Sequence, residues 1–234
     1  NQMLINIFSF NIIWVFIECL PILFAVKYGI DLWIWLRAVL GRKGVAVLST
    51  VISLANFGWY AVTANLFASS MIHLANNFGL GLDKGVWAPI LGTLCVLLGT
   101  LIALGGPEVI KGTNRFLVVA LLFVGLIIVG ICFVAVPIRD IMNVQPAIQE
   151  NLTPIERFMM SGEGNVAVAF SWSTQAFVLP RLAKSERSGY WATALSYGVV
   201  APFFAATGGV MALAMFVKTG VYESDPTTML STLS

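Results

Sequence analysis

The sequence predicts an all-α integral membrane protein. Apolar residues make up 59% of the 234 positions and charged residues only 10%, whereas about a quarter of a soluble domain is charged. The mean hydropathy is +0.90, and the apolar residues are gathered in runs that reach the ~20 residues a helix needs to cross a bilayer. We therefore expect a multi-pass protein of the inner or plasma membrane.

Six such runs follow one another and are interpreted as the spans of one transmembrane domain over residues 1–234. They cover residues 4–26, 45–76, 87–105, 116–137, 164–181 and 189–216. The second and the last are long enough to tilt or to project beyond the hydrocarbon. Because the chain opens at Asn1 without an initiator Met and runs at once into a span, we expect it to be an internal part of a longer protein.

Lysine and arginine are unevenly divided among the segments between the spans. Nine of them lie in segments 27–44, 106–115 and 181–188, and four lie in the alternate segments and the tail. Since cytoplasmic loops are enriched in these residues, the first three segments are predicted to face the cytoplasm.

Several chemistries have little support in the sequence. Cys19, Cys95 and Cys132 lie in different spans without paired spacing, which is typical of apolar thiols and not of a disulfide or a metal site. The single histidine, His73, is interpreted as a packing residue near a helix end. No nucleophile–base pair, metal ligand set or phosphate-binding glycine loop is recognisable. We expect no enzymatic activity, no metal site, no organic cofactor and no nucleic-acid partner.

The second span carries a polar stripe with an aromatic residue at its centre. At 100° per residue, its members project within one sector of a helix. Unpaired polar groups are costly in hydrocarbon, so the stripe needs a partner other than lipid. The cavity-wall interpretation is favoured because a large indole suits a close helix–helix seam poorly, and the seam is the alternative. The stripe consists of Ser49, Ser53, Asn56, Trp59, Thr63, Phe67 and Ser70, while Asn65 points the opposite way and is interpreted as a helix–helix contact.

The fifth span is short and polar at its middle. It begins Ser161-Gly162-Glu163-Gly164-Asn165 and reads Ser171-Trp172-Ser173-Thr174-Gln175 at its centre. A weak, interrupted hydrophobic segment indicates the discontinuous helix of a secondary transporter's binding site. The alternative is a continuous helix whose hydroxyls bond to the preceding turn. Tryptophan normally lies at the membrane interface, so Trp59 and Trp172 at mid-depth suggest the walls of a site for a flat ligand.

Glu18 is a carboxylate well inside the first span. Intramembrane carboxylates are expensive and suggest a site or a proton relay. Glu18 is therefore a candidate for proton coupling, with a vestibule lining or a pair with a basic residue as the alternatives.

Short motifs along most of the chain resemble the nucleobase–cation symport-1 family, the permeases for cytosine, purines, uracil, allantoin, thiamine and hydantoins. The resemblance rests on Ala25-Val26-Lys27-Tyr28-Gly29-Ile30, Leu36-Arg37-Ala38, Gly41-Arg42-Lys43-Gly44, Gly58-Trp59-Tyr60, and Ser171-Trp172 with Lys184 twelve residues later. It implies a 12-helix protein with the five-plus-five inverted repeat of the leucine-transporter type, of which the six spans would be helices 2 to 7.

The resemblance also implies a mechanism and a site. A planar substrate would stack between Trp59 and Trp172, and polar groups nearby would read its edges. Transport would use alternating access with Na⁺ or H⁺ as the coupling ion, whose site is expected outside this chain. The substrate-binding residues are thus predicted to be Asn56, Trp59, Thr63, Ser171, Trp172 and Gln175.

Three positions depart from the family's usual residues and leave the substrate open. Thr63 replaces a common Gln, Phe170 a common Gly and Arg181 a common acidic residue. A same-fold transporter of an amino acid or an ammonium compound is one alternative, because tryptophan walls would attract a cation through their π faces. A non-transporting scaffold or a subunit of a membrane enzyme is another. The expected partners are a small planar heterocycle and the lipid bilayer.

Overall fold

The computed structural model is helical, and it describes residues 2–144, 152–176, 180–223 and 225–233. The side chains of residues 2–4, 14, 16, 18, 161 and 168–176 lie outside that description. No strand occurs in the described residues. In chain order the elements are α1 (Gln2–Tyr28), α2 (Leu32–Asn77), α3 (Lys84–Leu104), α4 (Gly106–Ala135), α5 (Ile138–Asn143), α6 (Pro154–Ala176), the 3₁₀ turn η1 (Pro180–Leu182), α7 (Glu186–Leu195), the π-helical turn η2 (Ser196–Val200), α8 (Ala201–Thr219) and α9 (Pro226–Leu233).

Capping residues set several of the helix ends. The Asp83 carboxylate accepts a hydrogen bond from the Val86 amide at 3.0 Å and caps α3. Ser185 and Ser188 form a reciprocal capping box at the start of α7. α8 ends at Gly220, whose φ of 74° lies in the left-handed region that favours glycine. The sequence thus satisfies the backbone groups that a helix end leaves without partners.

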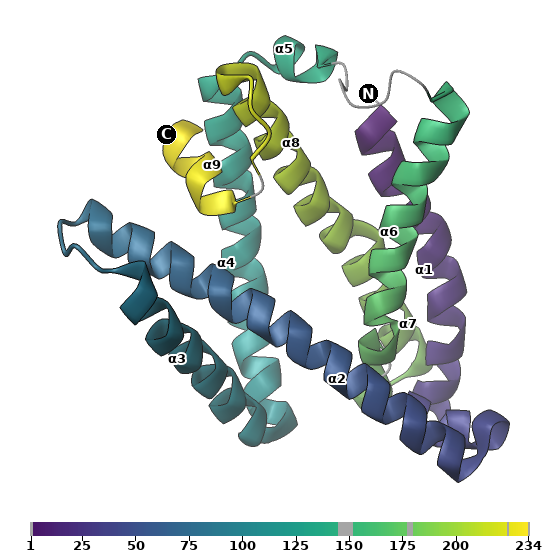
Figure 1. Ribbon diagram of the computed structural model, residues 1–234. Helices are drawn as coiled ribbons and strands as arrows, with labels where there is room; N and C mark the ends of the chain where they lie inside the picture. The colour runs from purple at the N-terminus through teal and green to yellow at the C-terminus, as the bar shows by residue number, and fades with distance from the viewer. Residues whose placement is uncertain (1, 145–151, 177–179, 224, 234) are drawn as a thin grey trace. The chain divides into compact units, whose positions relative to one another are not determined.

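The chain divides into two compact units. Unit 1 consists of Asn1–Val45, Ile128–Ser224 and Leu233–Ser234. Unit 2 consists of Ala46–Ile127 and Asp225–Thr232. The helices α1, α6, α7 and α8, which Figure 1 labels, belong to unit 1, whereas α3 and most of α2, α4 and α9 belong to unit 2.

α1 is the central helix of unit 1. It packs against α6, α7, η1, η2 and α8, and Figure 1 shows α6 alongside it. One face of α1 forms a buried cluster of Val15, Cys19, Ile22 and Ala25, against which Tyr190, Ala194 and Tyr197 pack. Close approach is possible because α7 presents Gly189 there, where a Cβ atom would meet Val26 Cγ2 at 2.5 Å.

Unit 2 buries few side chains. Ala68 and Ile72 of α2 are buried, as is Met229 of α9, whereas no residue of α3 is buried. The hydroxyls of Ser70 and Thr227 lie 3.1 Å apart and connect α2 to α9. The loop between α2 and α3 is held by the Asn76 side chain, which accepts a hydrogen bond from the Leu82 amide and donates one to its carbonyl.

Among the described residues, four helices are long and apolar enough to cross a membrane. They are Leu32–Asn77, Lys84–Leu104, Gly106–Ala135 and the continuous stretch Glu186–Thr219. Their apolar side chains are largely exposed, as contact with lipid requires. The protein is therefore an all-helical chain compatible with a membrane protein, and the predicted spans 45–76, 87–105, 116–137 and 189–216 overlap these helices.

Two segments between the predicted spans are helical as well. Residues 106–115 form the first turns of α4, which begins at Gly106 and has Pro107 and Glu108 in its first turn. Proline is favoured there because the first helical N–H has no partner. Residues 32–44 belong to α2, whose backbone leaves helical geometry at Gly41.

Candidate functional site

The predicted substrate-binding residues lie on two helices. Those on α2, in unit 2, are Asn56, Trp59 and Thr63. Those on α6, in unit 1, are Ser171, Trp172 and Gln175, whose backbone is helical and whose side chains lie outside the described residues. The residues on α2 and those on α6 are therefore described separately, and the stacking of a ligand between Trp59 and Trp172 stays a prediction.

On α2, the aromatic residue Trp59 has a polar residue about one helical turn away on either side. Trp59, near the middle of the helix, has 46% of its surface exposed. Asn56 is half-buried and Thr63 is exposed. Because these residues are three and four positions from Trp59, all three lie on one face of the helix. Thr63 Oγ1 donates to the Trp59 carbonyl at 2.9 Å, so the hydroxyl keeps its lone pairs to accept a further hydrogen bond.

The two ends of the polar stripe have partners within the protein. Near its start, Ser49 Oγ donates to the Ala46 carbonyl at 3.0 Å. Near its end, Ser70 contacts Thr227 of α9. Trp59, with 46% of its surface exposed, lies between these ends, and its role as a wall of a ligand site stays a prediction.

α6 is continuous from Pro154 to Ala176, through the polar residues 171–175 where the sequence predicted an interruption. It begins at a capping box, in which the Thr153 amide donates to Glu156 Oε2 at 2.7 Å and the Glu156 amide donates to Thr153 Oγ1 at 3.4 Å. The hydrogen bonds from the Thr153 side chain and backbone hold the pKa of Glu156 below its usual value. With this cap ahead of Pro154, the helix is established well before residue 161, and the continuous alternative is the one observed.

One of the two glycines in 161–165 serves packing. Gly162 is buried, and a Cβ atom placed on it would overlap the ring of Phe10 in α1. That ring also packs on Phe158, with the ring centroids 5.2 Å apart. Gly164 has open space beside it. Gly162 thus permits α1 and α6 to approach closely.

Besides the bend at Gly41 of α2, the described helices have a backbone irregularity at the π-helical turn Ser196–Val200 between α7 and α8. The Ala201 amide bonds to the Ser196 carbonyl, five residues earlier. Pro202 is fully buried in the next turn and has no N–H to bond to Gly198. This turn was not predicted from the sequence, in which Pro202 was the available signal, and π-helical turns are frequent at functional sites.

Two grooves in unit 2 are lined by residues of interest. A groove of about 500 Å³ includes Asn65, Ala64, Pro89 and Gly92, so Asn65 faces α3, away from the stripe. A second groove, of about 290 Å³, includes His73, Asn76, Lys84 and Asp225. The Nε2 atom of His73 is buried there and has no hydrogen-bond partner among the described residues.

Asp225 in the second groove is the N-terminal cap of α9. Partial burial alone raises the pKa of its carboxyl, but hydrogen bonds from Thr228 and Thr227 outweigh that effect and lower it below its usual value. Asp225 Oδ2 accepts from Thr228 Oγ1 at 2.8 Å, and Oδ1 accepts from the Thr227 amide at 3.2 Å. The carboxylate is thus charged at neutral pH and engaged by its own helix.

Glu18, the candidate for proton coupling, lies on α1 with its side chain outside the described residues. Within the part of the chain that the structure describes, no group of three or more His, Cys, Asp or Glu residues has the arrangement of a metal site. Comparison with family models, curated proteins and solved structures finds no match.

Proposed function

We propose that this protein is a secondary transporter that imports a planar, nucleobase-like heterocycle by alternating access with Na⁺ or H⁺ as the coupling ion. The four membrane-length helices support the transmembrane part of this proposal. The motifs shared with nucleobase–cation symport-1 permeases support the substrate class and the inverted-repeat fold. We also propose that this transport needs no organic cofactor.

The observation that carries the proposal is the face of α2 around Trp59. An indole with 46% of its surface exposed lies in the middle of a membrane-length helix, one turn from an amide and one turn from a hydroxyl. Base–aromatic stacking stabilises a planar heterocycle by about 1–3 kcal/mol per face. A polar side chain beside the stack distinguishes ligands strongly, because a ligand that lacks the matching edge leaves a buried group without a partner.

Each predicted residue has a role in this proposal. Trp59 and Trp172 provide the two stacking faces. Asn56 and Gln175 donate and accept at the amide or lactam edges of the ring, and Thr63 accepts through its remaining lone pairs. Ser171 supplies a further hydroxyl, and Glu18 is the proposed proton carrier if H⁺ is the coupling ion.

Uptake by the full-length protein tests this function. Labelled cytosine, uracil, adenine and allantoin are offered to proteoliposomes under an inward Na⁺ gradient, an inward H⁺ gradient or neither, with leucine and choline as representatives of the alternative substrates. We expect accumulation of at least one heterocycle that requires one of the gradients. Accumulation of leucine or choline without any heterocycle would contradict the proposal.

Competition experiments then test planarity separately from hydrogen bonding. Uracil and dihydrouracil share the same polar edge, but only uracil has a fully planar ring. If stacking on Trp59 contributes as proposed, uracil should inhibit uptake at a lower concentration than dihydrouracil. Equal inhibition by both compounds would mean that the site reads the edge alone.

A further inference from the structure

The Gly41-Arg42-Lys43-Gly44 segment is a bend in α2. Gly41 has φ 66° and ψ 177°, a backbone region that is open almost only to glycine. At Gly44, a Cβ atom would lie 2.9 Å from Leu40 Cβ, so the bend also requires a small residue there. The two glycines therefore separate a short helix, residues 32–40, from the rest of α2 and place Arg42 and Lys43 between them.

Length places the 32–40 helix at the membrane surface. After the bend, residues 45–77 of α2 alone correspond to about 50 Å at ~1.5 Å per residue. The hydrocarbon core of a bilayer is only ~30 Å thick. Because the long apolar run of α2 covers residues 45–76, the part that lies outside the hydrocarbon includes residues 32–40.

The 32–40 helix has one side packed and another exposed. Leu32 packs against the buried cluster of α1, and the Trp35 ring stacks on Phe24 with the centroids 5.7 Å apart. Val39 is 79% exposed and Leu40 is 44% exposed. An exposed apolar pair on a short helix at the membrane surface is typical of a segment that enters the boundary between headgroups and acyl chains.

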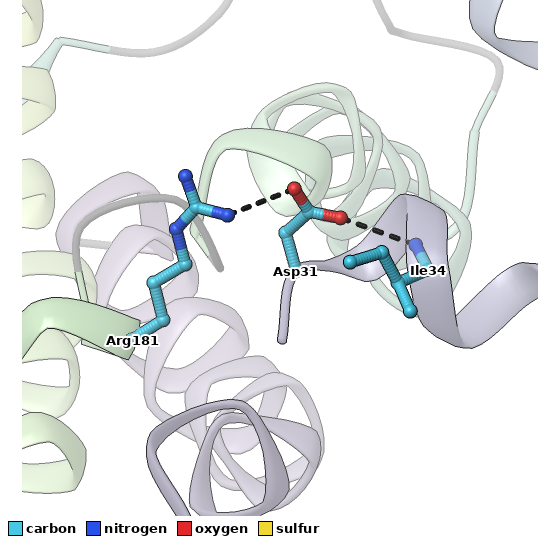
Figure 2. A network of polar contacts seen from close by, with 3 residues as sticks. All are labelled: Asp31, Ile34 and Arg181. Atoms are coloured by element: carbon cyan, nitrogen blue, oxygen red, sulfur yellow. Dashed lines mark hydrogen bonds and ion pairs between the residues drawn. The ribbon is translucent and has the colours of Figure 1, made fainter. Parts of the chain in front are cut away.

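Exposed cations surround this helix. They are Lys27, Arg37, Arg42 and Lys43, and the acidic residue of the same segment is Asp31. Figure 2 shows that the Asp31 carboxylate is already engaged: Oδ2 accepts from Arg181 Nη1 at 2.9 Å, and Oδ1 accepts from the Ile34 amide at 3.1 Å. Lys27 Nζ lies 5.7 Å from the centroid of the Tyr28 ring, and exposed Arg37, Arg42 and Lys43 are the cations placed to interact with anions outside the protein.

The same ion pair adds further cations to this surface. Arg181 belongs to η1. Exposed Lys184 lies in the connector that follows, and exposed Arg187 lies in the first turn of α7 beside one acidic residue, Glu186. Because Arg181 contacts Asp31 at the start of α2, both cation groups lie in unit 1 at the same end of α1.

We infer that residues 27–43 form a binding surface for anionic phospholipids, in which Arg37, Arg42 and Lys43 pair with headgroup phosphates while Val39 and Leu40 enter the acyl boundary. Basic residues beside a transmembrane helix attract anionic lipid in this way. The exposed apolar pair favours a lipid over a soluble polyanion. A nucleic acid is disfavoured further because the Trp35 ring is already stacked on Phe24.

Retention of lipid by the purified full-length protein tests the inference. The protein is exchanged into detergent containing equal amounts of phosphatidylglycerol and phosphatidylcholine, and the lipid that stays bound is quantified by mass spectrometry. We expect phosphatidylglycerol to be enriched, and its affinity to fall by roughly 5-fold for each cation removed in Arg37→Gln, Arg42→Gln and Lys43→Gln. Raising the salt concentration from about 0.1 M to about 1 M should weaken this enrichment, because the screening length falls from ~10 Å to ~3 Å.

A charge-matched control separates this surface from a general effect of net charge. The triple variant Lys84→Gln, Arg139→Gln and Lys218→Gln removes three exposed cations from other segments and should leave the enrichment unchanged. Val39→Asp should lower the retention of phosphatidylglycerol. The double variant Arg37→Lys with Arg42→Lys preserves both charges and should retain the lipid. It remains informative if the variant that combines Arg37→Gln, Arg42→Gln and Lys43→Gln fails to fold.

Three results would overturn the inference. The first is an equal loss of bound phosphatidylglycerol in the control variant and in the variant that combines Arg37→Gln, Arg42→Gln and Lys43→Gln. The others are full retention of phosphatidylglycerol in the latter variant, or full displacement of the lipid by inorganic phosphate. The last result would assign the surface to a free anion. None of these measurements involves transport, so they test this surface independently of the substrate.

Discussion

Gly162 and Gly164 are two residues apart on α6, yet only Gly162 has a neighbouring helix against it. A Cβ atom on Gly162 would overlap the Phe10 ring, whereas Gly164 has open space. We expect Gly162→Ala to lower the stability of the full-length protein by about 1–3 kcal/mol, as overpacking does, and Gly164→Ala to be neutral or slightly stabilising, since alanine is the better helix former by ~1 kcal/mol.

Thermal unfolding in detergent measures both variants. Adding Phe10→Leu should relieve part of the cost of Gly162→Ala, because the two side chains are in contact and their effects are coupled. Equal melting temperatures for the two alanine variants, or no coupling to Phe10, would contradict the proposed packing of α1 on α6.

Asp31 combines an ion pair with a helix cap, and substitutions can separate the two. Asp31→Asn keeps a side-chain oxygen for the Ile34 amide but loses the charge that faces Arg181. Because both side chains are partly exposed, the ion pair should contribute no more than about 1 kcal/mol, so Asp31→Asn should cost little. Asp31→Ala also removes the cap and should cost about 1 kcal/mol more. Unfolding measurements that gave equal losses for Asn and Ala would show that the cap contributes nothing.

At the scale of elements, α9 should become less ordered in acid. The Asp225 pKa is lowered from its ordinary value of 3.8, so the folded helix favours the charged form. Its contribution to stability is present above pH 3.8 and is lost as the pH falls through the lower folded-state value. Amide hydrogen exchange of residues 226–233, corrected for the intrinsic rate at each pH, should lose protection in this window.

The control for α9 is Asp225→Asn, which keeps an oxygen for the Thr227 amide and cannot titrate. Protection of α9 should be weaker in this variant and should no longer change between neutral pH and pH 3. A wild-type α9 whose protection stays constant down to pH 2 would show that Asp225 does not cap it through its charge.

Local chemistry explains which elements were predictable. Long apolar runs identified the helices that are able to span a membrane, because burying apolar surface is the dominant requirement there. α6 begins at Pro154, ahead of the predicted span 164–181, because Thr153-Pro154-Ile155-Glu156 is a capping box with proline at the first helical position. The polar residues 171–175 were interpreted as a helix break, but α6 continues through them to Ala176.

Other features depend on backbone geometry that composition does not reveal. Gly41 and Gly44 were noticed as part of a family motif, whereas the bend they form follows from the positive φ of Gly41. The π-helical turn before Pro202 arises because proline cannot donate to Gly198. Neither feature changes the hydropathy of the chain, so the pattern of apolar runs does not predict the bend or the π-helical turn.

At the scale of the whole molecule, helical periodicity predicted which residues share a face of α2 but not how α2 is placed against α6. Trp59 and Trp172 belong to different units, and their relative placement depends on packing between helices, which a local pattern does not encode. The proposed function therefore depends most on one feature of the whole molecule, namely that the rings of Trp59 and Trp172 face the same ligand.

Binding of the transported heterocycle to the full-length protein tests that claim most directly. Isothermal titration of Trp59→Ala and Trp172→Ala should each show affinity weakened by about 5- to 150-fold, which corresponds to ~1–3 kcal/mol per stacking face, while Phe at either position should retain much of the affinity. Trp14→Ala on α1 serves as the control and should bind normally. Loss of binding in Trp14→Ala, with intact affinity in well-folded Trp59→Ala and Trp172→Ala, would contradict the account.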